Sequence, residues 1–169
     1  MASGCGMNTL AKEMPGRFYD VGIEEQHAIT FAAGLAAGGM KPFCNIYSSF
    51  SQRAYDQILH DVALQELPVV LCLDRGGLVG EDGATHHGCY DMSAYRSIPG
   101  AVIAAPKDEL ELKNMMYSAM LAETGPYIIR YPRGYGEGVD WQSAEYQSLE
   151  SGKGEKVLDG TDVAVFAAG

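Results

Sequence analysis

Short apolar runs alternate with longer amphipathic stretches along most of this chain. The apolar runs predict strands at residues 17–21, 42–47, 68–74, 101–105 and 127–131. The stretches between them predict helices at residues 24–38, 52–65 and 108–123. Apolar residues throughout a run such as PVVLCLD are typical of a strand buried on both faces of a parallel sheet. The alternation predicts an α/β fold with a mostly parallel, open sheet and helices on both faces.

This alternation of predicted strands and helices ends near residue 136. Residues 137–161 are rich in Gly, Glu and Ser and predict an acidic linker, and residues 162–169 (DVAVFAA and a final Gly) predict the first strand of a further, C-terminal domain. Residues 1–16 lack the βα unit that normally opens an α/β domain. We therefore expect residues 1–136 to form one domain without its N-terminal βα unit, within a longer enzyme.

Composition excludes several functions. The net charge of −10 argues against nucleic-acid binding, which needs clustered Lys and Arg. No apolar stretch approaches the roughly 20 residues of a membrane-spanning helix. The four cysteines form no CxxC pair, so no structural zinc site is expected, and the His86–His87 pair has no evident third ligand, so no other metal site is expected in this chain. No signal peptide is evident in the sequence, and a reducing cytoplasm is the expected compartment.

Acids, arginines and a histidine pair follow the predicted strands. In open parallel sheets ligands bind beyond the carboxyl ends of the strands, so these groups are expected to converge. Residues 75–88 form a long loop of the kind that is usually functional. The pattern predicts a site for an anionic small molecule with acid–base groups. Simpler interpretations stay open. Glu25 could serve only to stabilise the N-terminus of its helix through the helix dipole, and Arg133 could be a surface charge.

Several motifs together resemble one known family. The chain resembles, over residues 4–138, the central pyrimidine-binding domain of the 1-deoxy-D-xylulose-5-phosphate synthases, which are transketolase-like thiamine diphosphate enzymes. The strings that carry this resemblance are DVGIEEQHA (20–28), QRAYDQ (52–57), LHDVA (59–63), VGEDG (79–83) and RYPRG (130–134). Glu24 departs from the family pattern, in which a small residue is common at this position.

The resemblance implies a cofactor, thiamine diphosphate, and a role for two residues in holding it. Glu25 is expected to hydrogen-bond N1′ of the aminopyrimidine and so to favour the tautomer that takes up a proton. Phe50 is expected to stack on the pyrimidine ring, because an aromatic face suits a flat heterocycle.

The resemblance also implies substrates, pyruvate and glyceraldehyde 3-phosphate, which are joined with loss of CO2 in the biosynthesis of isoprenoid precursors, thiamine and pyridoxal. Besides Glu25, the catalytic residues are expected to be Tyr47, Asp82 and His86. Arginines suit phosphate through their forked donors, and the candidates for substrate binding are Arg53, Arg75 and Arg133.

The diphosphate-binding domain of this family, with its Mg²⁺ motif, is not in the chain. We therefore expect Mg²⁺ to bind only through that domain, the isolated chain to be inactive, and the enzyme to be a homodimer. Two other interpretations remain: the pyrimidine-binding chain of a split transketolase-like enzyme, or a non-catalytic dimerisation or regulatory module.

Overall fold

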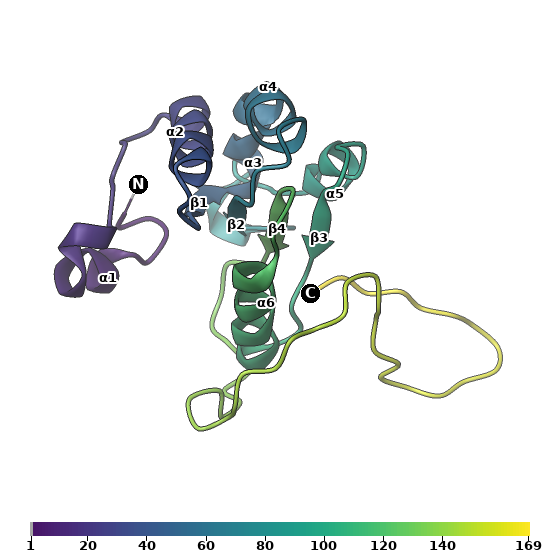
Figure 1. The fold of residues 1–169 in the computed structure, drawn as a ribbon. Helices are drawn as coiled ribbons and strands as arrows, with labels where there is room; N and C mark the ends of the chain where they lie inside the picture. Colours follow the sequence, from purple (N-terminus) through teal and green to yellow (C-terminus); the bar gives the residue numbers. More distant parts are fainter. Residues whose placement is uncertain (1) are drawn as a thin grey trace.

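A four-stranded parallel sheet forms the centre of the protein (Figure 1). The computed structural model describes residues 2–169. The strand order is β1-β2-β4-β3, with β1 at Phe43–Tyr47, β2 at Val70–Asp74, β3 at Val102–Ala104 and β4 at Tyr127–Arg130. Tyr47 at the end of β1 pairs in register with Asp74 at the end of β2. The carboxyl ends of these strands therefore lie together at one edge of the sheet.

Helices cover both faces of this sheet (Figure 1). One face carries α2 (Glu25–Ala37), α3 (Ser48–Ser51), η2 (Gln52–Ala54), α4 (Tyr55–Gln57), η3 (Ile58–Ala63) and α5 (Asp91–Tyr95). The other face carries α6 (Glu109–Leu121). The predicted α/β fold, a parallel open sheet between helices, is confirmed.

Strand β2 shows why the sheet is buried on both sides. All five of its residues are buried. Because successive side chains of a strand point to opposite faces, Leu71 and Leu73 join the core beneath α2, whereas Val70 and Cys72 join the core beneath α6. The uniformly apolar run is the sequence signal of this two-sided burial.

Two predicted helices are confirmed with small shifts in their ends. Residues 24–38 contain α2, and residues 108–123 contain α6. Asp108 caps α6, since its carboxylate accepts a 2.8 Å hydrogen bond from the Glu111 N–H. The helix predicted at 52–65 begins earlier, at Ser48, and passes through α, 3-10 and π turns before it ends at Ala63. Residues 48–51, which precede the predicted helix, are therefore helical as well.

The strand predicted at residues 17–21 is wrong. A 3-10 helix, η1, spans Pro15–Arg17, after the short helix α1 (Asn8–Glu13), and the segment that follows is not among the strands of the described sheet. High β-propensity forms a strand only where a neighbouring strand completes the ladder of backbone hydrogen bonds.

The acidic segment after residue 136 runs as extended chain along α6 before it turns away (Figure 1). Asn114 and Ser118 of α6 accept hydrogen bonds from the backbone N–H groups of Gln147 and Leu149 at 3.0 and 2.8 Å. The segment is thus attached to the domain by its own backbone. Residues 162–169 contain no assigned strand, and their place in a further domain stays a prediction, as do the domain boundaries.

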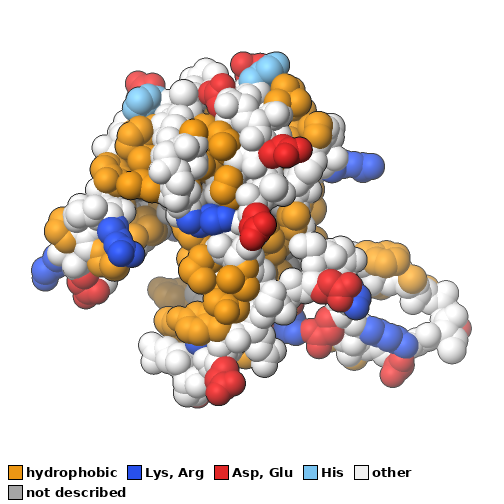
Figure 2. All heavy atoms as spheres, in the orientation of Figure 1, with side chains coloured by type: hydrophobic (Ala, Val, Ile, Leu, Met, Phe, Trp, Pro, Cys, Tyr) orange, Lys and Arg blue, Asp and Glu red, His pale blue; other side chains and the backbone are white. Residues whose placement is uncertain are grey.

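A cavity of about 1040 Å³ lies between the N-terminal segment and the β1 edge of the sheet. Apolar side chains of α2, β1 and α6 line it, among them Phe31, Phe43 and Met116. Figure 2 shows hydrophobic side chains gathered where α6 lies, and Met116, Met120 and Leu121 of this helix are exposed. No helix among residues 2–169 is long and apolar enough to cross a membrane.

Candidate functional site

All the candidate residues lie at the edge of the sheet where its strands end. Tyr47 ends β1, Arg75 follows β2 directly, and Arg133 follows β4. The rest come from the start of α2 and the segments after β1 and β2: Glu25, Phe50, Arg53, Asp82 and His86. The structure brings all eight into one chain of contacts, as the topology of a parallel sheet requires.

Glu25 supplies a buried carboxylate at one end of this chain of contacts. It lies in the first turn of α2 and is 9% exposed, whereas the adjacent Glu24 is exposed. Its Oε2 is 3.4 Å from an Arg53 guanidinium nitrogen, which is long for a charged hydrogen bond. Glu25 therefore keeps acceptor capacity for a further donor.

An aromatic cluster lies next to this carboxylate. The Phe50 ring stacks on Tyr47 with 5.5 Å between centroids, and His86 meets Phe50 edge-on at 5.0 Å. The Arg53 guanidinium lies 5.2 Å from the centre of the Phe50 ring. Burial raises the pKa of Tyr47, although Arg75 works against the rise, so its phenol stays neutral and can donate a proton in a hydrogen bond.

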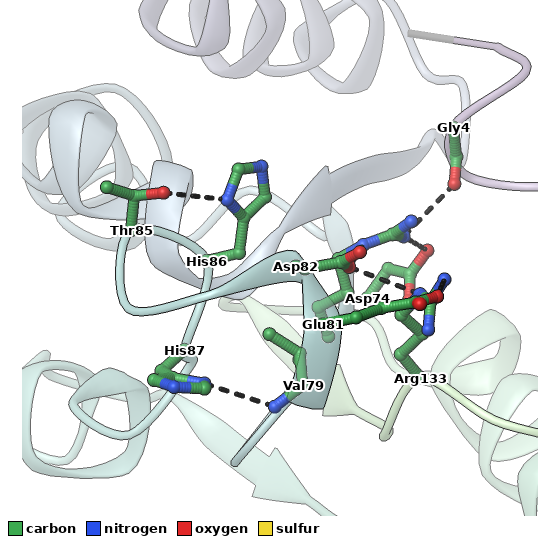
Figure 3. Close-up of polar contacts among 10 residues, drawn as sticks. Gly4, Asp74, Val79, Glu81, Asp82, Thr85, His86, His87 and Arg133 are labelled. Atoms are coloured by element: carbon green, nitrogen blue, oxygen red, sulfur yellow. Dashed lines mark hydrogen bonds and ion pairs between the residues drawn. The ribbon is translucent and has the colours of Figure 1, made fainter.

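Arg75 connects the aromatic cluster to the acids. Its guanidinium carbon lies 3.8 Å from the centre of the Tyr47 ring. Its Nε donates to Asp82 at 3.0 Å, and its Nη1 donates to Asp74 at 2.8 Å and to the Gly4 carbonyl at 3.1 Å (Figure 3). Burial works against the charge, but the bond to Asp82 and the nearby Asp74 raise the pKa of Arg75 above its ordinary value. Arg75 is thus a fixed cation.

The backbone of Arg75 is also unusual. Its φ of +64° places it in the left-handed region of backbone conformation, which residues other than glycine rarely adopt. Such a conformation costs about 1–3 kcal/mol and persists only where the surrounding structure holds it. The three hydrogen bonds of its guanidinium are part of that support.

Arg133 completes the group from the end of β4. Its Nε lies 3.1 Å from Asp82 Oδ2, and its Nη2 donates to Glu81 at 3.1 Å (Figure 3). Asp82 therefore lies between the two arginines Arg75 and Arg133. A phosphate or carboxylate of a ligand would find paired guanidinium groups here.

The structure adds residues that the sequence analysis did not single out. Asp74 is the last residue of β2, and burial raises its pKa, while Arg75 beside it opposes the rise. Its position at the carboxyl end of the apolar run was the available signal. The sequence analysis also did not single out Glu81, which accepts a hydrogen bond from Arg133.

The two adjacent histidines serve different contacts. The His86 ring faces Phe50, and its Nδ1 is hydrogen-bonded to the Thr85 hydroxyl at 2.9 Å (Figure 3). His87 turns the other way, and its Nδ1 accepts a 3.1 Å hydrogen bond from the Val79 N–H across the loop. Within residues 2–169 no group of three His, Cys, Asp or Glu side chains could hold a metal ion.

These residues suit a flat heterocycle. Glu25, Tyr47 and Phe50 all line the 1040 Å³ cavity, so a buried carboxylate and an aromatic face border the same space. Two further cavity-lining groups, the thiols of Cys44 and Cys72, are unsuited to nucleophilic chemistry because burial raises their pKa to about 12. The chemistry available is hydrogen bonding to a ring nitrogen, ring stacking and anion binding.

Comparisons with known proteins identify the family to which this chain is similar. Residues 1–137 match the family "Transketolase, pyrimidine binding domain". The whole chain is 58% identical to a 1-deoxy-D-xylulose-5-phosphate synthase of Bacteroides thetaiotaomicron and 59% identical to one of Parabacteroides distasonis. It covers 26% and 27% of those proteins, so it spans about a quarter of the length of the curated relatives it matches.

Solved structures show the same fold. A split-gene transketolase, described as an inactive β4 tetramer, superposes with a TM-score of 0.71 at 27% identity, over 89% of this chain and 47% of that one. A transketolase from Pichia stipitis superposes with a TM-score of 0.63 at 22% identity, over 69% of this chain and 18% of that one. The chain therefore belongs to the transketolase pyrimidine-binding domain family.

Proposed function

We propose that this chain is the pyrimidine-binding domain of a 1-deoxy-D-xylulose-5-phosphate synthase. Such an enzyme joins pyruvate to glyceraldehyde 3-phosphate with loss of CO2. The single observation that carries the proposal is the placement of Glu25 and Phe50 on one cavity, directly beside a cluster of arginines. Identity of 58–59% over the whole chain to proteins named for this activity supports it.

Two residues would hold the pyrimidine part of thiamine diphosphate. The Glu25 carboxylate would accept a hydrogen bond from the protonated ring nitrogen N1′. Burial of Glu25 would strengthen that bond because it excludes water. Phe50 would stack on the ring. When bound, the cofactor supplies the electron sink for decarboxylation, which no side chain of this chain can supply.

The remaining candidates would bind and orient the two substrates. Tyr47 carries a neutral hydroxyl and His86 carries an imidazole ring, and both lie beside Phe50, so they could move or hold a proton close to the cofactor. The guanidinium groups of Arg53, Arg75 and Arg133 would bind the phosphate of the triose. Asp82 would hold two of them, Arg75 and Arg133, in place through its carboxylate.

The site would be complete only with further protein. We infer that Mg²⁺ and the diphosphate bind to another domain of the same enzyme, that the enzyme is a cytoplasmic homodimer, and that the isolated chain is inactive.

One observation favours a second candidate function. The split-gene transketolase chain with a similar fold is a separate polypeptide that forms an inactive tetramer, according to its description. The present chain could likewise be the pyrimidine-binding subunit of a split enzyme acting on sugar phosphates. A purely structural module is less well supported, because such a module needs none of the site contacts described above.

A chimeric enzyme tests these alternatives. In it, residues 1–169 replace the matching segment of the Bacteroides thetaiotaomicron protein, and CO2 release from pyruvate is measured with thiamine diphosphate and Mg²⁺. Release that depends on glyceraldehyde 3-phosphate supports the proposed function. Activity on ketose phosphates without pyruvate supports the second candidate, and an inactive but folded chimera contradicts both.

In this chimera, Arg133→Ala is expected to raise the KM for glyceraldehyde 3-phosphate about tenfold or more, since one charged hydrogen bond is worth about 1.5–3 kcal/mol. The KM for pyruvate should change much less, because pyruvate carries no phosphate. Steady-state kinetics with each substrate varied in turn provides the measurement. Arg96→Ala, which removes an exposed arginine at the end of α5, is the matched control. Equal effects on both substrates would contradict a phosphate role for Arg133.

A further inference from the structure

The loop that carries Asp82 and His86 is closed at its base by two glycine segments. The Gly77 N–H donates to the Gly88 carbonyl at 2.9 Å, and the Gly88 N–H donates to the Gly77 carbonyl at 2.8 Å. The intervening residues include the 3-10 turn η4 (Gly80–Asp82). The direction in which the loop leaves the sheet is therefore set at this base.

The base rests directly on buried polar side chains. A Cβ atom on Gly76 would lie 2.9 Å from a guanidinium nitrogen of Arg130, and one on Gly88 would lie 2.5 Å from the Ser48 hydroxyl. Both glycines are buried. Backbone thus packs against Arg130 and Ser48 without space for a side chain.

Asp91 connects these two supports. It is 3% exposed, and its Oδ2 accepts hydrogen bonds from Ser48 Oγ at 2.8 Å and from Arg130 Nε at 2.9 Å. Its Oδ1 accepts a further bond from the Met92 N–H at 2.7 Å. Arg130 itself is only 7% exposed. The three side chains Ser48, Asp91 and Arg130 form a buried, hydrogen-bonded network beneath the loop, which we call the platform.

The platform also adjoins the residues of the candidate site. Ser48 follows Tyr47 in the chain, and Gly76 follows Arg75, whose backbone is held at a positive φ. A shift of Arg130 would therefore move Gly76 and, with it, the Arg75 guanidinium. A shift of Ser48 would move Gly88 and the limb of the loop that carries His86.

We propose that Asp91 and Arg130, with Ser48, are positioning residues that fix the 76–88 loop and Arg75 for substrate binding. This inference rests on the proposed function, in which Arg75, held in place by Asp82, binds the triose phosphate. All three platform side chains are buried, so they act through the backbone that they support. Loss of the platform should therefore weaken phosphate binding rather than remove a reacting group.

The test uses the chimeric enzyme with Asp91→Asn or Arg130→Lys, two conservative changes that keep side-chain volume and some hydrogen bonds. We expect the KM for glyceraldehyde 3-phosphate to rise about tenfold with a smaller change in kcat. Amide hydrogen exchange within residues 76–88 should also become about tenfold faster, while exchange in α6 stays unchanged. Asp108→Ala, which removes the side-chain cap of α6, is the control for a general loss of stability.

A merely structural role would give a different result. It would lower the fraction of active enzyme, and so the measured kcat, with an unchanged KM and no selective change in exchange of the loop. That outcome, or the same KM effect in Asp108→Ala, would overturn the inference. An inactive unsubstituted chimera would contradict the proposed function instead, and the exchange of residues 76–88 would still decide whether the platform positions the loop.

Discussion

The chimeric enzyme with Glu25→Ala is expected to release CO2 from pyruvate about 10²–10⁴ times more slowly than the unsubstituted chimera, the range of a lost acid–base group. Glu25 is the buried carboxylate on the cavity that Phe50 also lines. A hydrogen bond from the ring nitrogen to this carboxylate would favour the reactive tautomer of the aminopyrimidine. Alanine offers no acceptor, and the buried ring nitrogen would be left without a partner.

The measurement is CO2 release at saturating pyruvate, with thiamine diphosphate binding followed separately by calorimetry. Glu25→Gln keeps the volume but not the charge, and we expect it to be nearly as slow. Glu24→Ala is the matched control, because Glu24 is the adjacent acid, is exposed and makes no capping hydrogen bond with its side chain. If Glu24→Ala were as slow as Glu25→Ala, or if Glu25→Ala retained full activity, the role of Glu25 would be wrong.

The second large effect is expected on stability. Arg130→Met in the 169-residue chain should lower the free energy of unfolding by about 3–5 kcal/mol, because it leaves the Asp91 carboxylate buried without its counter-charge. The side chains of this pair are 8% and 1% exposed, and their atoms are 2.9 Å apart. Against a usual stability of about 5–15 kcal/mol, this is a large fraction. Urea unfolding followed by circular dichroism provides the measurement.

Two further variants show whether the buried charge is the cause. Asp91→Leu combined with Arg130→Met removes both charges, and we expect it to recover much of the lost stability, as apolar replacement of a buried pair often does. Lys153→Met breaks an exposed pair with Glu150 and should leave stability unchanged. A double variant no more stable than Arg130→Met would contradict the explanation by unpaired charge.

Much of the fold was predictable from local pattern. The uniformly apolar residues 68–74 indicated a buried parallel strand, and the amphipathic residues 108–123 indicated the helix α6. The strand expected at residues 17–21 failed because β-propensity says nothing of whether a neighbour is present to pair with it. The succession of α, 3-10 and π turns within residues 48–63 could not be predicted from the sequence either, because it depends on packing against the sheet rather than on helix propensity.

The sequence by itself determined the class of fold and the edge of the sheet at which the site lies. It did so because side-chain periodicity reports burial, and because the connections between parallel strands place the segments after them at one edge. Only the tertiary structure decided which groups touch: that Asp82 lies between Arg75 and Arg133, and that the platform of Ser48, Asp91 and Arg130 supports the loop. These contacts join segments up to 82 residues apart in the chain, since Ser48 and Arg130 meet through Asp91. Their geometry follows from packing in three dimensions, which no local pattern encodes.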